Sequence, residues 1–146
     1  MITQAICSTF KAELLEGVHN FGVFGGSPVG GNTFKIALYT SSATLSSATT
    51  AYTTSGETTG TGYTAGGQTL TNLGVSLSGS TAYLSFSDVT WSAATISAAG
   101  ALIYNSTQSN KAVCVLSFGG VYSSTNGNFT LTFPANDSTH AIIILN

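Results

Sequence analysis

The sequence predicts a mainly β protein, an antiparallel and jelly-roll-like β-sandwich with one N-terminal α-helix. Apolar residues recur at every fourth position near the N-terminus and at every second position from residue 33 onward. Turn signals rich in glycine, serine and asparagine separate the short apolar segments that follow. A length of 146 residues fits one domain. We therefore expect residues 1–146 to form a single unit, with a helix at 3–16, a glycine-rich loop at 17–32 and the sandwich at 33–146.

The N-terminal segment predicts one amphipathic helix over residues 3–16. Thr3 is placed to cap its start and Gly17 to end it. A helix this short is marginal by itself in water, so its apolar side should pack against the rest of the protein. The side consists of residues spaced four apart, namely Ile2, Ile6, Phe10, Leu14 and Val18.

The loop at 17–32 combines glycines with the apolar side chains of Phe21, Val23 and Phe24. A protein rarely exposes such side chains unless they bind something. We expect all three to contact other copies of the chain or another protein, although they could instead pack under the protein's own sheet. Tyr52 and Tyr63 are predicted to belong to the same kind of interface, because tyrosine is favoured where proteins meet.

From residue 33 onward the pattern predicts strands. The tract at 41–67 is rich in serine, threonine and glycine, and we expect it to be an ordered excursion with a short strand near 51–54. Short strands at such regular spacing are typical of a sandwich or barrel. The strands are expected at 33–40, 69–78, 82–89, 95–104, 112–118, 128–133 and 141–145. The turns between them are expected at 78–80, 105–110, 119–120, 126–127 and 134–138.

The tryptophan, the two cysteines and some of the tyrosines are expected to pack in the core. Trp91 lies between two predicted strands and is interpreted as a core anchor, rather than a residue that stacks on carbohydrate. Tyr83 and Tyr104 fit either the core or an interface. Cys7 and Cys114 are too few and too far apart in sequence for a disulfide framework, and are expected to be small buried hydrophobic residues.

The low charge of the chain excludes several functions. Three lysines, five acidic residues and no arginine are present, while serine and threonine exceed a quarter of the residues. An ordinary soluble domain devotes about 25% of its residues to charged types. Nucleic-acid binding needs clustered basic residues, so we expect no nucleic-acid partner. No stretch approaches the ~20 apolar residues that cross a bilayer, and no signal peptide is recognised, so we expect no membrane partner.

No catalytic pattern stands out, and we expect neither an enzyme nor a cofactor. The serine-hydrolase motif G-x-S-x-G is missing, and no pair of carboxylates has the spacing of a glycosidase. The glycine-rich segment 56–67 lacks the lysine of a phosphate-binding loop. His19 and His140 lie far from each other and from the cysteines, unlike the paired ligands of structural zinc sites.

Several segments nevertheless resemble a widespread family of small virion structural proteins of tailed bacteriophages. These segments are 10–17, 34–40, 62–67, 89–96, 100–105 and 127–134, and the main departure from the family is the insertion-like stretch 22–31. The resemblance brings no catalytic residue with it. It implies a component of the virion that is assembled in the cytoplasm of the bacterial host.

Within a virion, the small size, β-rich domain and low charge favour a capsid decoration or cement protein. Its partners would be the major capsid protein and further copies of the chain, as a dimer or trimer. The alternative is a tail or fibre-associated receptor module that binds host glycans through its tyrosines.

Overall fold

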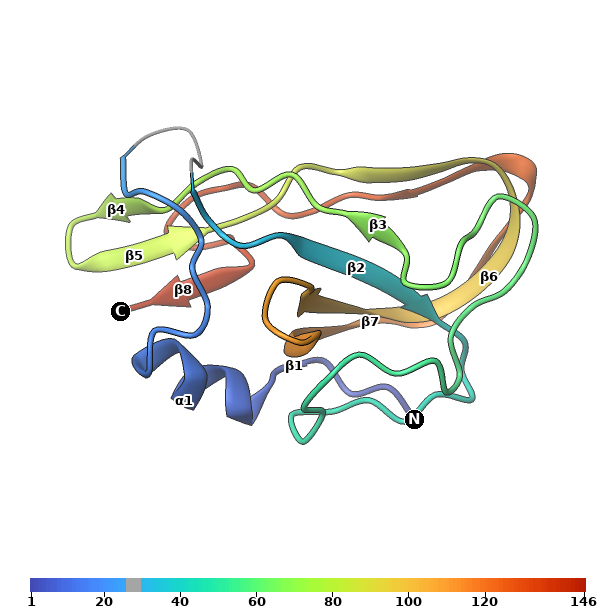
Figure 1. Cartoon of the computed structure of the whole chain (residues 1–146). Coiled ribbons are helices and arrows are strands. Elements are labelled where there is room, and N and C mark those ends of the chain that lie inside the picture. The colour runs from blue at the N-terminus through green and yellow to red at the C-terminus, as the bar shows by residue number, and fades with distance from the viewer. Residues whose placement is uncertain (26–29) are drawn as a thin grey trace.

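Two antiparallel sheets and one short helix form the fold in this computed structural model, which describes residues 1–25 and 30–146 (Figure 1). The helix is α1 (Ser8–Leu15). The larger sheet has the strand order β1 (Ala5–Ile6), β7 (Lys111–Leu131), β6 (Val89–Asn105), β2 (Phe34–Tyr39) and β3 (Gln68–Thr69). The smaller sheet has the order β4 (Ser76–Ser78), β5 (Thr81–Leu84) and β8 (Ile143–Leu145). The prediction of a mainly β, sandwich-like protein with one N-terminal helix is confirmed.

A long hairpin of β6 and β7 dominates the larger sheet and curves back on itself at the right of Figure 1. The curve coincides with a break in register. Ala98 pairs with Tyr122, but Gly100 already pairs with Ser117. One residue of β6 thus faces four residues of β7, and such an excess bends the longer strand. Gly100 leaves room for this packing, because a Cβ there would lie 2.5 Å from a backbone carbonyl oxygen of β7.

The predicted turns at 119–120 and 126–127 are wrong, because both pairs lie inside β7. Gly119 and Asn126 do have the positive φ angles of turn residues, +75° and +48°. A β-bulge uses the same backbone conformation as a turn, so sequence alone does not separate the two. For this reason, the strands expected at 112–118 and 128–133 are parts of one strand.

Other predicted boundaries also need correction. The strand expected at 69–78 is two short strands, β3 and β4, which flank Gly74 with a φ of +89°. The strand expected at 82–89 is also divided, between the end of β5 and the start of β6. The tract at 41–67 is ordered, as predicted, but it makes isolated bridges rather than a strand at 51–54. The first and last predicted strands are confirmed as β2 and β8, with shorter bounds.

The N-terminal helix is shorter than predicted, because its first residues form the edge strand β1 instead. Ala5 and Ile6 pair with β7, and the Thr3 N–H donates to the Leu45 carbonyl oxygen at 2.8 Å rather than capping a helix. The predicted end at Gly17 is confirmed. Gly17 has a φ of +75°, and the Val18 N–H donates back into the last turn at 2.9 Å, as in a Schellman motif.

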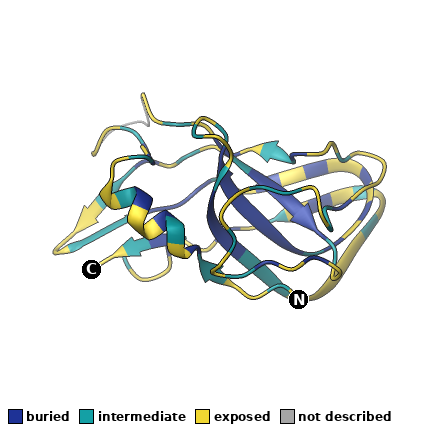
Figure 2. Ribbon diagram, turned by 60° about the horizontal axis from the view of Figure 1, so that its bottom comes forward, coloured by how far each residue is buried: buried dark blue, intermediate teal, exposed yellow. Residues whose placement is uncertain are grey.

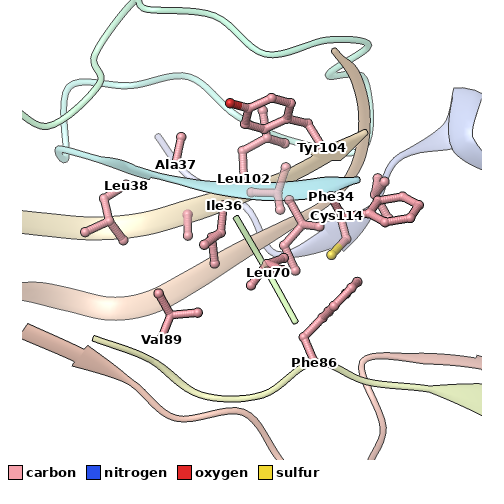
Figure 3. Packing of buried hydrophobic residues seen from close by; sticks show 14 of the residues in the cluster. Phe34, Ile36, Ala37, Leu38, Leu70, Phe86, Val89, Leu102, Tyr104 and Cys114 are labelled. Atoms are coloured by element: carbon pink, nitrogen blue, oxygen red, sulfur yellow. The ribbon is translucent and has the colours of Figure 1, made fainter. Parts of the chain in front are cut away.

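The core lies on both sides of β2, whose residues are buried at five of six positions. Figure 3 shows Ile36 and Leu38 on the side of Val89, and Ala37 on the opposite side with Tyr104. Figure 2 shows buried residues concentrated on these central strands, with more exposure at α1 and the smaller sheet. A strand covered on both faces needs a second layer, and the tract at 41–67 supplies it.

The predictions for individual core residues hold. Trp91 is 2% exposed and packs edge-on against Phe129 at 6.2 Å between ring centroids. Cys7 and Cys114 are free and buried. Tyr104, for which the sequence left two roles open, belongs to the core.

Candidate functional site

Phe21, predicted to be an interface residue, is instead part of the protein's own core. Its ring stacks on Phe34 with centroids 4.4 Å apart and planes within 3° of each other, and it meets Phe10 edge-on at 6.1 Å. The Asn72 side-chain amide donates to its carbonyl oxygen at 2.8 Å. The prediction for this residue is therefore wrong, because tertiary packing covers the ring.

Val23 and Phe24 differ from Phe21, since each is 61% exposed. The loop beside them is held by a hydrogen bond from the Gly25 N–H to the Val75 carbonyl oxygen, 3.2 Å long. Both side chains remain candidates for contact with a partner. The rest of the predicted loop includes residues 26–29, which lie outside the described part of the chain.

Tyr52 and Tyr63, the other predicted interface residues, both bind one carboxylate. Their phenols donate to Glu57 at 2.7 Å and 2.8 Å, and the Gly66 N–H donates to the same carboxylate at 2.7 Å. The Tyr63 oxygen also accepts the Leu38 N–H of β2 at 2.9 Å. Both residues are half-buried. The structure thus brings them together as the attachment of the tract 41–67 to β2.

These phenols are poor candidates for chemistry. Burial raises the pKa of Tyr63 and Tyr52 well above the usual range, and the hydrogen bonds to Glu57 raise both further. Burial also raises the pKa of Tyr104 to about 12. The phenols therefore stay protonated at neutral pH, and they serve as hydrogen-bond donors rather than as nucleophiles or bases.

A second polar cluster, which the sequence did not reveal, lies under α1. Glu13 of the helix accepts hydrogen bonds from His19 Nε2 at 2.7 Å and from Lys111 Nζ at 2.9 Å. The His19 side chain is fully buried. Burial acts to raise the pKa of Glu13, but the hydrogen bonds from Lys111 and His19, together with the positive charge of Lys111, outweigh it and hold that pKa below its usual value.

The tautomer of His19 follows from its second neighbour, Asn105. Asn105 Oδ1 accepts the backbone N–H groups of Thr107 at 3.1 Å and Gln108 at 3.3 Å, so Nδ2 is the donor end of this amide. Nδ2 lies 3.1 Å from His19 Nδ1, which must then be an acceptor. The ring proton is accordingly on Nε2, where it is donated to Glu13. This cluster ties the helix, the loop and the β6–β7 turn together.

An apolar groove lies between α1 and β8. It has a volume of about 540 Å³ and adjoins a smaller hollow of about 130 Å³, with which it shares Leu14, Ile143 and Leu145. Leu15 on one wall is 92% exposed and Leu145 on the other is 53% exposed. The groove is lined by Ile6, Phe10, Lys11, Leu14, Leu15 and residues 141–145.

The remaining candidate residues do not converge. Within residues 1–25 and 30–146, no group of three or more histidine, cysteine or acidic side chains is placed to hold a metal ion. Asp137 and His140 form a local turn, in which Asp137 Oδ1 accepts the Thr139 N–H at 2.9 Å. The hydrogen bonds from Thr139 and then His140 hold the pKa of Asp137 well below its usual range. No helix in the described chain is long and apolar enough to span a membrane.

Comparison with protein-family models, curated proteins and solved structures finds no match to this chain. The groove was not anticipated from sequence. Its only signals were the adjacent Leu14 and Leu15 and the apolar run at 141–145, both of which also fit a buried core.

Proposed function

We propose that this chain is a structural protein of a tailed-bacteriophage virion, and that it decorates the capsid and stabilises its shell. The observation that carries the proposal is the exposed apolar groove between α1 and β8, with Leu15 and Leu145 open to solvent. A protein rarely leaves such a surface uncovered unless a partner covers it. The resemblance of six segments to phage virion proteins supports the choice of partner.

The low charge of the chain supports a role in which the protein binds to the surface of another protein. With three lysines, five acidic residues and no arginine, the surface carries little charge to repel a neighbouring protein. Apolar contacts should then dominate the binding. Debye screening weakens only charge-based attraction, so the binding should change little with salt concentration.

Binding to shells tests the proposal directly. Purified capsids that lack the protein would be mixed with the recombinant chain, sedimented, and viewed by cryo-electron microscopy. Decoration predicts regular density on the shell and hundreds of copies per particle, with nearly equal occupancy at low and high salt. Absence from purified virions, or failure to sediment with the shell, would contradict the proposal.

A receptor module in the tail is the second candidate, and one observation favours it. Tyr122 is 58% exposed and lines a hollow of about 270 Å³ with Phe118 and Thr130, an arrangement of aromatic and hydroxyl groups on which a sugar could stack. Tyr52 and Tyr63 contribute less to this reading because their hydroxyls already bind Glu57. A few copies per virion, together with glycan binding that Tyr122→Ala abolishes, would favour this candidate.

A further inference from the structure

The groove runs along the backbone edge of β8. All three residues of β8 line it, Ile143, Ile144 and Leu145, and so do Ala141 and Ile142, which lead into the strand. Side chains alternate between the two faces of a strand, so consecutive residues line one groove only where it follows the edge of the strand. β8 is the outermost strand of the β4–β5–β8 sheet. Among the described residues, no second strand pairs with it on the side away from β5.

An open strand edge presents backbone N–H and C=O groups that another strand can bind. The opposite wall of the groove is helical and apolar, formed by Phe10, Leu14 and Leu15. An occupant that satisfies both sides needs an extended backbone toward β8 and apolar side chains toward α1. A polypeptide strand meets both requirements.

We propose that this groove accepts an extended apolar segment of a partner protein, which adds a fourth strand to the β4–β5–β8 sheet. Addition of a strand to an open edge is a recurring form of peptide recognition, in which main-chain hydrogen bonds supply affinity and side-chain contacts supply specificity. That the partner is a capsid subunit rests on the proposed function, whereas the strand-accepting groove does not.

Charge points to a partner other than a second copy. Lys11 is the one charged side chain on the lining of the groove, so the entering segment should carry a carboxylate near it. Four of the five side-chain carboxylates of this chain already accept hydrogen bonds from their own protein, and within residues 1–25 and 30–146 Glu16 is the one that accepts none, so a second copy offers few carboxylates to meet Lys11. The four are Glu13, Glu57, Asp88 and Asp137.

Synthetic peptides test the groove without a virion. The probe is an eight-residue peptide of alternating threonine and valine with one central glutamate. One control replaces the glutamate with lysine. A second control is methylated on alternate backbone nitrogens, which removes donors on one edge and leaves the side chains unchanged. Binding is measured by titration calorimetry, and its location by hydrogen exchange of the amides of 142–145.

We expect the glutamate peptide to bind and to slow exchange in β8. The methylated control should bind at least tenfold more weakly, and the lysine control about twofold to fivefold more weakly, since Lys11 is exposed. Leu15→Ser should weaken binding by tenfold or more, whereas Val121→Ser, at a residue 61% exposed on β7, should not. Lys11→Glu should reverse the preference between glutamate and lysine. Equal binding of the methylated peptide, unchanged binding to Leu15→Ser, or no binding at millimolar peptide would overturn the inference.

Peptide binding and capsid binding, measured on the same protein, separate this inference from the proposed function. If wild-type protein decorates capsids but no peptide binds, the groove is not a strand acceptor and the decoration role stands. If peptides bind as expected but the protein never sediments with capsids, the groove stands and the decoration role fails.

Discussion

Replacement of Phe21 by alanine distinguishes a core residue from an interface residue. Phe21 is 6% exposed, stacks on Phe34 at 4.4 Å and meets Phe10 at 6.1 Å, so truncation removes a buried ring and two aromatic contacts. Phenylalanine-to-alanine changes in cores cost about 3–5 kcal/mol. The Asn72 hydrogen bond to the backbone of residue 21 can persist, so we expect the lower half of this range, about 3–4 kcal/mol.

The assay is urea unfolding followed by tryptophan fluorescence, together with a thermal scan. In a protein of this size, each kcal/mol shifts the Tm by roughly 2–4 °C, so the expected loss is about 6–16 °C. The matched control is Phe24→Ala, because that ring is 61% exposed and its loss should change the unfolding free energy by less than about 0.5 kcal/mol. If Phe21→Ala were as stable as the control, the ring would not belong to the core and the packing argument would fail.

Three further predictions concern the polar clusters and the glycines. The pKa of Glu13 is lower in the folded protein than the usual 4.5, so its contribution to stability is present above that pH and is lost as the pH falls below it. Glu13→Gln should therefore flatten the pH dependence of unfolding below pH 4.5, and an unchanged slope would exclude its role. Tyr63→Phe removes the acceptor of the Leu38 N–H and should cost about 1–3 kcal/mol in urea unfolding; a loss below 0.5 kcal/mol would mean that water replaces the phenol. Gly67→Ala would place a Cβ 1.8 Å from a carbonyl oxygen of β2 and should lower the Tm far more than Gly79→Ala, which has a similar positive φ but open space; equal shifts would show that only backbone strain matters.

Short-range patterns in the sequence were sufficient for the elements whose chemistry is local. The end of α1 follows from Gly17, which takes the left-handed conformation a Schellman motif requires. The alternation in β2 is equally local, and it predicted the strand within two residues. The burial of Trp91 was predictable because a large aromatic side chain next to predicted strands has few alternatives to the core, although the structure places Trp91 inside β6 rather than between two strands.

The start of α1 and the course of β7 were not predictable in the same way. Ala5 and Ile6 lie within the segment predicted to be helical, but the edge of β7 offers them backbone hydrogen bonds that a sequence pattern does not contain. Gly119 is likewise typical of a turn. In the structure it lies in the break of register between β6 and β7, which lets the two long strands curve together.

For the candidate site, sequence alone determined which residues were available and the tertiary structure decided which are used. Phe21, Val23 and Phe24 are three similar side chains within four residues, yet packing against Phe34 buries the first and leaves the other two exposed. The groove along β8 depends on which edge of that strand remains unpaired. Strand pairing joins residues far apart in the chain, and the free energy of that choice comes from the whole packed core rather than from any local segment.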